Sequence, residues 1–187
     1  IKDIKEDQDI ISFDVLCLQE TWLGQFENES EDYSIVGKKM EFNNKGRGKG
    51  IATFFPANFE LQLNITEDLY QVTSITSSEL TVINIYRSEN SNDKKLIQHL
   101  DQLISTTTKS IVICGDFNFC QRDENKHPVL TFLYNSNFLP GFNPPRSSHI
   151  GGRCLDQAYF RLNAKIEIEK IDLRPCYFSD HDKIQIT

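Results

Sequence analysis

The chain has 187 residues and a formal net charge of −7, from 27 acidic and 20 basic side chains. Apolar residues make up 39% of it and charged residues 25%, which supports a folded core and argues against wholesale disorder. The acidic balance disfavours a protein that coats nucleic acid through its overall charge. It leaves open an enzyme that holds a phosphate through a metal, because a divalent cation requires clustered carboxylates.

The length predicts a single domain over residues 1–187. No run approaches 18 consecutive apolar residues, and the charged N-terminal segment lacks the apolar stretch of a signal peptide. The 5 cysteines form no CxxC pair, so a zinc knuckle is not expected. These features predict an intracellular protein, nuclear or cytoplasmic, without a membrane partner.

Strands dominate the elements predicted along the chain. Residues 1–12 are expected to be the end of a helix, and residues 13–20 form a short apolar run that predicts a strand buried on both faces. Two alternating segments, 70–76 and 79–86, predict a hairpin. Further strands are predicted over residues 35–39, 50–55, 59–65, 110–115, 154–160, 165–173 and 183–187.

Two helices are predicted between these strands. The clearest follows a cap at Asn92 or Ser91, and its apolar face comprises Leu96, Ile97, Leu100, Leu103 and Ile104. A shorter helix is expected over residues 127–137, with Pro128 in its first turn. Many strands, short connections and no long alternation of strands and helices predict an α+β fold, with two mainly antiparallel sheets packed face to face and helices outside.

Four polar clusters lie where apolar strands end, and they are the candidates for chemistry. They are Gln19-Glu20-Thr21, Gly115-Asp116-Phe117-Asn118, Leu155-Asp156-Gln157 and Ser179-Asp180-His181. Each alone is typical of a solvated strand end or a turn. Because all four stand at strand termini, two packed sheets could bring them to one rim.

These residue types suit metal-assisted hydrolysis of a phosphate ester. Glu20 and Asp180 could hold a hard cation through their oxygens. Asp116 and Asn118 lie two residues apart, so along a strand they would project to one side. His181 can exchange a proton near neutral pH, and Asp156 could set its tautomer, as a carboxylate does beside a catalytic imidazole.

The order LQET, a strand ending in Tyr86, GDFN, LDQ and SDH resembles the endonuclease/exonuclease/phosphatase superfamily, which is DNase I-like. The resemblance covers residues 13–187 and implies a four-layer αββα sandwich. It further implies that the chain begins after the family's first strand, so the domain is expected to be incomplete at its N-terminus. It implies a Mg²⁺-dependent enzyme, with Mn²⁺ as a possible substitute.

The resemblance also implies roles for individual residues. Glu20 matches the metal-binding Glu, and Asp180 matches the residue beside the catalytic His, near the metal. Tyr86 matches a Tyr that contacts the scissile phosphate. Asp116 matches the Asp that positions or activates the attacking water, and Asn118 matches the Asn that orients the water or the phosphate. Asp156 matches the Asp that hydrogen-bonds the catalytic His, and His181 matches that His. Whether Asp116 or His181 takes the proton stays open.

The substrate class is less specified than the chemistry. The motifs LQETW, GDFN and RCLDQAY are most similar to endonuclease domains of mobile elements such as non-LTR retrotransposons, which favours DNA as the substrate. A basic run that includes Lys45, Arg47 and Lys49 could contact the DNA backbone, although a solvated charged loop is the simpler interpretation. Arg87 could contact a phosphate or be a solvated strand end. The alternatives are a phosphoesterase acting on a small phosphorylated molecule, and a degenerate non-catalytic module that binds nucleic acid or protein.

Overall fold

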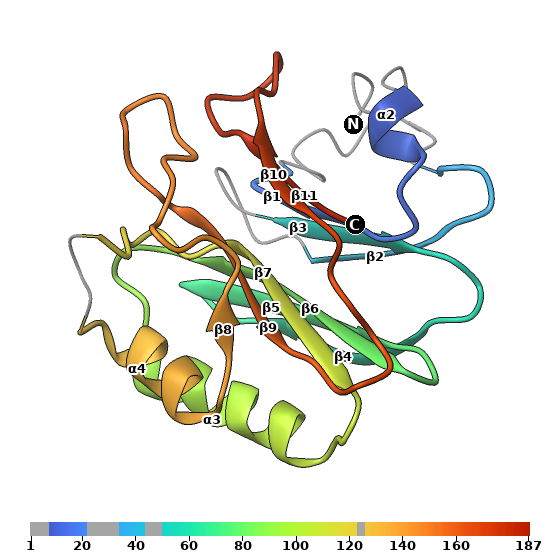
Figure 1. The fold of residues 1–187 in the computed structure, drawn as a ribbon, viewed down its shortest axis with the longest axis horizontal. Coiled ribbons are helices and arrows are strands. Elements are labelled where there is room, and N and C mark those ends of the chain that lie inside the picture. The colour runs from blue at the N-terminus through green and yellow to red at the C-terminus, as the bar shows by residue number, and fades with distance from the viewer. Residues whose placement is uncertain (1–7, 22–33, 44–49, 123–125) are drawn as a thin grey trace.

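The computed structural model describes residues 8–21, 34–43, 50–122 and 126–187, which form three helices and eleven strands. Figure 1 shows them as layers, with the longer helices on one side and two small sheets on the other. The helices are α2 (Gln8–Ile11), α3 (Asp93–Ser105) and α4 (Pro128–Asn135). The strands are β1 (Leu16–Gln19), β2 (Lys39–Asn43), β3 (Ile51–Phe55), β4 (Glu60–Thr66), β5 (Tyr70–Thr76), β6 (Leu80–Arg87), β7 (Ser110–Asp116), β8 (Leu139–Pro140), β9 (Asp156–Arg161), β10 (Ile171–Arg174) and β11 (Lys183–Ile186).

A six-stranded sheet in the order β4-β5-β6-β7-β9-β8 forms the centre of the molecule. Its pairings are antiparallel except for β6 and β7, which run parallel because α3 carries the chain back between them. The predicted hairpin is confirmed as the antiparallel pair β5–β6. This one parallel pair aligns the carboxyl ends of β6 and β7 at the same edge of the sheet.

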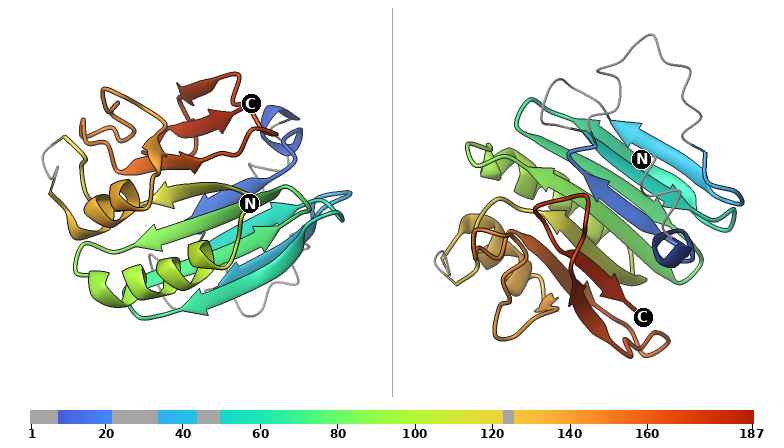
Figure 2. Two further views of the ribbon diagram at one scale, coloured as in Figure 1. Left: turned by 60° about the horizontal axis from the view of Figure 1, so that its bottom comes forward. Right: turned by 90° about the horizontal axis from the view of Figure 1, so that it is seen from above.

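The two longer helices cover one face of this sheet, as the left view of Figure 2 shows. The predicted apolar stripe of α3 is confirmed, since Leu96 and Leu100 are fully buried against sheet residues such as Ile83 and Ile113. Asn92 is the N-cap and accepts a hydrogen bond from the Lys95 amide at 3.2 Å. Burial of this face anchors the central strands.

The opposite face is covered by two smaller sheets, β1-β3-β2 and β10-β11. Phe55 and Cys17 pack against Val82 and Cys114 of the central sheet, and the β10–β11 pair packs against Val112, Ala158 and Phe160. The far side of β1-β3-β2 carries Ile11 of α2. The α+β sandwich predicted from the sequence is therefore confirmed, with α2 as the helix that the described residues place on its outer side.

Two predicted strands differ from the structure. Residues 35–38 form a turn in which Gly37 adopts a φ of +78°, and the strand begins only at Lys39. Residues 165–170 are not a strand, although Ile166 and Ile168 alternate with charged residues. Ile168 packs on the central sheet beside Phe160, so the alternation reflects side-chain burial. Backbone bonds to Thr187 begin only at Glu169 and Lys170, and the strand begins at Ile171.

No helix among the described residues is long and apolar enough to cross a membrane.

Candidate active site

Three predicted site residues lie abreast on adjacent strands of the central sheet. Tyr86 at the end of β6 is the parallel partner of Asp116 at the end of β7, and Asp116 is the antiparallel partner of Asp156 at the start of β9. Residues directly opposite one another share a face of the sheet. That face is turned toward the two smaller sheets, since Val82 and Cys114 on the same face contact Phe55 and Cys17.

Gly115 permits the close approach of β7 to β6 just before this row. Its φ is +143°, and a Cβ at this position would lie 1.9 Å from the carbonyl oxygen of Ile85. Any side chain would therefore push the two strands apart where Tyr86 and Asp116 meet. The glycine of the GDFN motif thus determines the spacing of the site.

Asn118 holds the Asp116 carboxylate by both oxygens. Its backbone amide donates to Oδ1 at 2.9 Å and its Nδ2 donates to Oδ2 at 2.8 Å, in a turn where Asn118 has a φ of +51°. Burial, followed by the charge of Asp156, raises the pKa of Asp116 to about 7. A carboxyl group with this pKa can exchange a proton near neutral pH.

His181 is paired with Asp156, as predicted. The Nδ1 atom of His181 lies 2.6 Å from Oδ2 of Asp156, and this hydrogen bond is the main reason that the pKa of His181 is raised to about 9. The ring is therefore largely imidazolium at neutral pH, which suits stabilisation of an anion better than proton abstraction. Ser148, fully buried, accepts a hydrogen bond from the Asp156 amide and so fixes the start of β9.

Glu20 reaches the row from the smaller sheet. It follows β1 with a φ of +49°, and the Tyr86 hydroxyl donates to its Oε1 at 3.1 Å. Burial and then the charge of Glu20 raise the pKa of Tyr86, so its hydroxyl stays protonated. Tyr86 therefore links the two layers at the site.

A groove of about 1630 Å³ lies between β1 and β11, and five of the predicted site residues line it. Within the described part of the chain, β1 pairs only with β3 and β11 only with β10, so the edges of these two strands border the groove. Glu20, Asp116, Asp156, Asp180 and His181 all belong to its lining. The site is thus open to a ligand that enters between the two smaller sheets.

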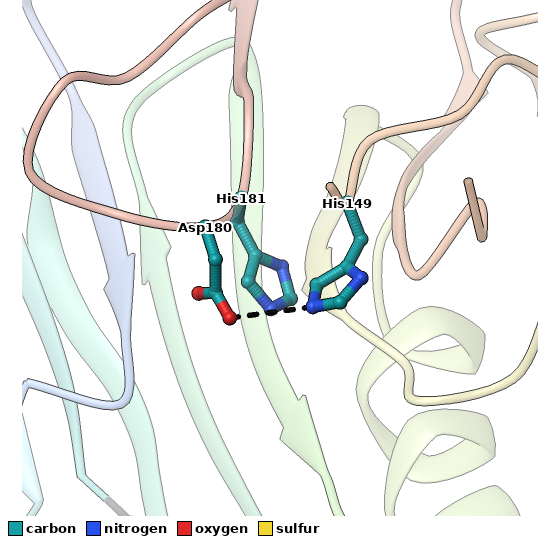
Figure 3. Close-up of side chains that lie close together, drawn as sticks. All are labelled: His149, Asp180 and His181. Atoms are coloured by element: carbon teal, nitrogen blue, oxygen red, sulfur yellow. Dashed lines mark ion pairs between the residues drawn. The ribbon is translucent and has the colours of Figure 1, made fainter. Parts of the chain in front are cut away.

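The donor set of this groove fits a divalent metal. Glu20 and Asp180 are exposed carboxylates, and neighbouring negative charge contributes to the raised pKa of Asp116, so a cation would relieve electrostatic repulsion. His149, Asp180 and His181 also offer ligand atoms that lie within 4.8 Å of one another. Figure 3 shows these three side chains converging from two loops.

The basic residues predicted to contact a phosphate, Arg87 and the basic run, are not found at the site among the described residues. Arg87 is buried: its Nε and Nη2 donate to the Asp93 carboxylate at 2.7 and 3.3 Å, and its Nη1 donates to the Phe117 carbonyl. Because neighbouring residues of a strand point to opposite faces, Arg87 turns toward α3 while Tyr86 turns toward the site. The structure therefore does not bring Arg87 to the groove. Lys45, Arg47 and Lys49 lie outside the described residues.

Several supporting residues were given no individual role in the sequence analysis. Asn84, fully buried, joins the two layers by accepting from Gln19 Nε2 at 2.5 Å and donating to the Ala52 carbonyl. Gln157 donates to the Phe119 carbonyl at 2.7 Å and so anchors the turn after Asp116. A polar side chain inside an apolar run was the available signal for both. His149 stands in a loop and had no such signal.

The sequence comparisons agree with this arrangement. The model of the endonuclease/exonuclease/phosphatase family matches residues 3–181, so the chain belongs to this family. It is accordingly a hydrolase that acts on phosphodiester bonds, in a family that is generally metal-dependent. No curated protein matches the sequence significantly.

Solved structures share the fold at low sequence identity. A 3′-5′ exonuclease, NExo, from Neisseria meningitidis is 16% identical with a TM-score of 0.69, over 100% of this chain and 92% of that one. The endonuclease domain of TRAS1, a telomere-specific non-LTR retrotransposon, is 11% identical with a TM-score of 0.69, over 97% and 88%. The human Nocturnin catalytic domain is 18% identical with a TM-score of 0.59, over 93% and 81%. These likenesses establish the fold.

Proposed function

We propose that the chain is a Mg²⁺-dependent endonuclease that cleaves phosphodiester bonds in DNA. The observation that carries the proposal is the row Tyr86–Asp116–Asp156, with Asn118 holding Asp116 and His181 paired to Asp156, along an open groove. It combines a proton acceptor, an anion-stabilising group and carboxylates for a cation within one site. Among the solved structures, TRAS1 is named as an endonuclease and a second NExo structure holds a product DNA hairpin.

The residues divide the reaction between them. Asp116, with a pKa of about 7, is the group suited to take the proton of the attacking water, and Asn118 keeps its carboxylate oriented. The water oxygen then bonds to phosphorus as the bond to the leaving sugar oxygen breaks, and the leaving oxygen takes up a proton from solvent to become a hydroxyl group. The His181 imidazolium stabilises the charge that develops on the phosphate oxygens, while Asp156 holds the ring in place.

Glu20 and Asp180 are the residues that would hold the metal. A bound divalent cation would neutralise the phosphate and polarise its oxygens. Tyr86 keeps the Glu20 carboxylate directed at the row through its hydroxyl. Lys45, Arg47 and Lys49 remain proposed contacts to the DNA backbone.

Nicking of supercoiled plasmid DNA tests the proposal. The wild-type chain should nick the plasmid with Mg²⁺ but not with EDTA, and a chain carrying Asp116→Asn should be nearly inactive under both conditions. If the chain hydrolyses nucleotides or other small phosphate esters but does not nick the plasmid, its substrate is a small phosphorylated molecule and not DNA. Metal-independent DNA binding without hydrolysis of any substrate would instead support a non-catalytic module.

The basic run needs a separate test. Reversing Lys45, Arg47 and Lys49 to Glu should weaken DNA binding and make nicking less sensitive to salt, because fewer phosphate contacts release fewer counterions. Hydrolysis of bis-(p-nitrophenyl) phosphate, which has no extended backbone, serves as the control and should be unchanged. Equal nicking by the triple variant and the wild type would remove this segment from the substrate interface.

A further inference from the structure

His149 is a second histidine at the site, and none of the roles described above requires it. It lies in the loop before β9, with its ring centroid 4.9 Å from that of His181 and at 75° to it. Its Nε2 atom lies 3.3 Å from Oδ2 of Asp180, the contact drawn as a dashed line in Figure 3. The side chain is 24% exposed, whereas that of Asp180 is 65% exposed.

Backbone contacts fasten the loop of His149 to the loop of Asp180. The Ile150 amide donates to the Asp180 carbonyl at 2.9 Å, and the Asp182 amide donates to the Ser148 carbonyl at 2.7 Å. His149 and His181 form an antiparallel β-bridge between these bonds. Main-chain hydrogen bonds on both sides of His149 therefore hold its loop against the loop that carries Asp180 and His181.

The tautomer of His149 follows from its other ring nitrogen. The Gly151 amide donates a hydrogen bond to Nδ1 at 2.9 Å, so Nδ1 presents a lone pair and the neutral ring carries its proton on Nε2. A Cβ at residue 151 would lie 2.9 Å from Nδ1, so the glycine permits this approach. The loop thus places Nε2 of His149, with its proton, 3.3 Å from Oδ2 of Asp180.

We propose that His149 is a positioning residue that holds the Asp180 carboxylate for a divalent cation. A carboxylate this exposed has little packing to fix its rotamer. The Nε2 atom of His149 lies at ion-pair distance from Oδ2, which leaves Oδ1 for the cation. Hydrogen-bond partners that orient a metal ligand typically contribute about 10–100-fold to metal affinity. The inference rests on the proposed function, in that it takes Asp180 to be a metal ligand.

Direct ligation of a metal by His149 through Nε2 is the competing interpretation, because His149 offers one of the three ligand atoms that lie within 4.8 Å of one another. Ligation through Nε2 requires a lone pair there and hence a proton on Nδ1. That proton would face the N–H group of Gly151, which now donates to Nδ1. The local geometry therefore favours His149 as a donor to the carboxylate.

Mn²⁺ binding to the full chain, followed by electron paramagnetic resonance, tests this without any substrate. His149→Ala should raise the Mn²⁺ dissociation constant about 10-fold, within the range for such partners. His149→Gln, whose amide can replace the Nε2 donor, should recover most of the affinity. Ile150→Ala is the matched control, since this side chain is 86% exposed in the same loop and its backbone contact is retained. Unfolding midpoints of all the variants should agree with that of the wild type.

A double-mutant cycle separates positioning from an independent effect. If His149 acts through Asp180, the variant His149→Ala, Asp180→Ala should bind Mn²⁺ no more weakly than Asp180→Ala alone. Gly151→Ala should also weaken Mn²⁺ binding, because it displaces the ring while leaving the histidine in the chain. Long-range ¹⁵N–¹H correlation spectra should show the His149 proton on Nε2, assigned by the signals lost in His149→Gln.

Several outcomes would overturn the inference. The first is an Mn²⁺ affinity that is unchanged in His149→Ala, or that falls equally in His149→Gln and His149→Ala. The second is a His149 proton on Nδ1, or losses of Mn²⁺ affinity that add in the double-mutant cycle. The third is a wild-type chain that binds no Mn²⁺. The proposed function can fail without overturning this inference. A chain whose Mn²⁺ binding depends on His149 but which nicks no DNA would retain the inference and lose the nuclease.

Discussion

The central sheet and the edge strands of the smaller sheets are buried to different extents. In the central sheet, Ile83 and Ile113 are completely buried beneath the helices, and β5, β6 and β7 are buried along almost their whole length. In the smaller sheets, β1 and β11 are only half-buried, and the groove opens between them. The active site lies at the seam, because Asp116 belongs to the packed layer and His181 to the open one. A rigid sheet therefore fixes the reactive row, while the open layer supplies the groups that meet the ligand.

The largest expected effect tests whether both layers contribute to the same reaction. Asp116→Asn and His181→Ala should each lower the rate of DNA cleavage by about 10²–10⁴-fold, because one removes a proton acceptor and the other a positive charge beside the phosphate. Rates should be measured at saturating Mg²⁺, with circular dichroism to check folding. If Asp116→Asn is impaired but His181→Ala turns over at a near-normal rate, only residues of the central sheet take part in the chemical step.

The buried ion pair of Arg87 sharpens the contrast between the two layers. Arg87→Ala should destabilise the fold by about 3–5 kcal/mol, since it leaves the Asp93 carboxylate without its main partner. Urea unfolding would measure this loss. Arg153→Ala is a suitable control, because Arg153 pairs with Glu89 on the surface and should contribute less than about 1 kcal/mol. If the Arg87→Ala variant is stable but has a raised KM for DNA, Arg87 contacts the substrate.

Truncation of one isoleucine in each layer compares their packing directly. Ile83→Ala should cost about 2–5 kcal/mol of unfolding free energy, because the site is fully buried and a cavity would remain. Ile184→Ala in β11 should cost less, since its surroundings are half-buried and border the groove. Chemical denaturation with the same m-value analysis would check both. Equal losses would mean that the open layer is as tightly packed as the central sheet.

The smallest expected effect concerns pH. The pKa of His181 is raised from 6.5 to about 9, so its contribution to stability is present below about pH 6.5 and is lost as the pH rises through 9. The pKa of Asp116 is raised from 3.8 to about 7, so its ionisation also destabilises the fold as the pH rises over that window. The metal-free chain should therefore lose stability with increasing pH.

Asp156→Asn tests the cause of this dependence. It removes the main partner of His181 and one of the charges acting on Asp116, so both pKa values should move back toward their ordinary ranges. Titration of the His181 ring by nuclear magnetic resonance in EDTA would follow the shift. The stability of Asp156→Asn should then vary less with pH than that of the wild type. An unchanged His181 titration would contradict the assigned pair.

Local pattern predicted most of the elements but not where each side chain points. The apolar stripe of α3 and the hairpin β5–β6 were predictable, because helical and strand periodicities differ. The strand expected over residues 165–173 was wrong for its first part, since alternation reports burial and not backbone pairing. Tyr86 and Arg87 are neighbours with similar apparent roles. Only the sheet decides that Tyr86 faces Glu20 and the smaller sheets, whereas Arg87 faces Asp93 of α3.

The sequence by itself determined the set of chemical groups, because carboxylates, an amide and an imidazole at strand ends are properties of residue order. It also determined the glycine that allows β6 and β7 to approach at Asp116. Only the tertiary structure decided the row Tyr86–Asp116–Asp156, since strand order and register depend on contacts between segments as far apart as residues 86 and 156. The same holds for His149, whose direction is set by the Gly151 amide and whose partner comes from a loop about thirty residues further along the chain.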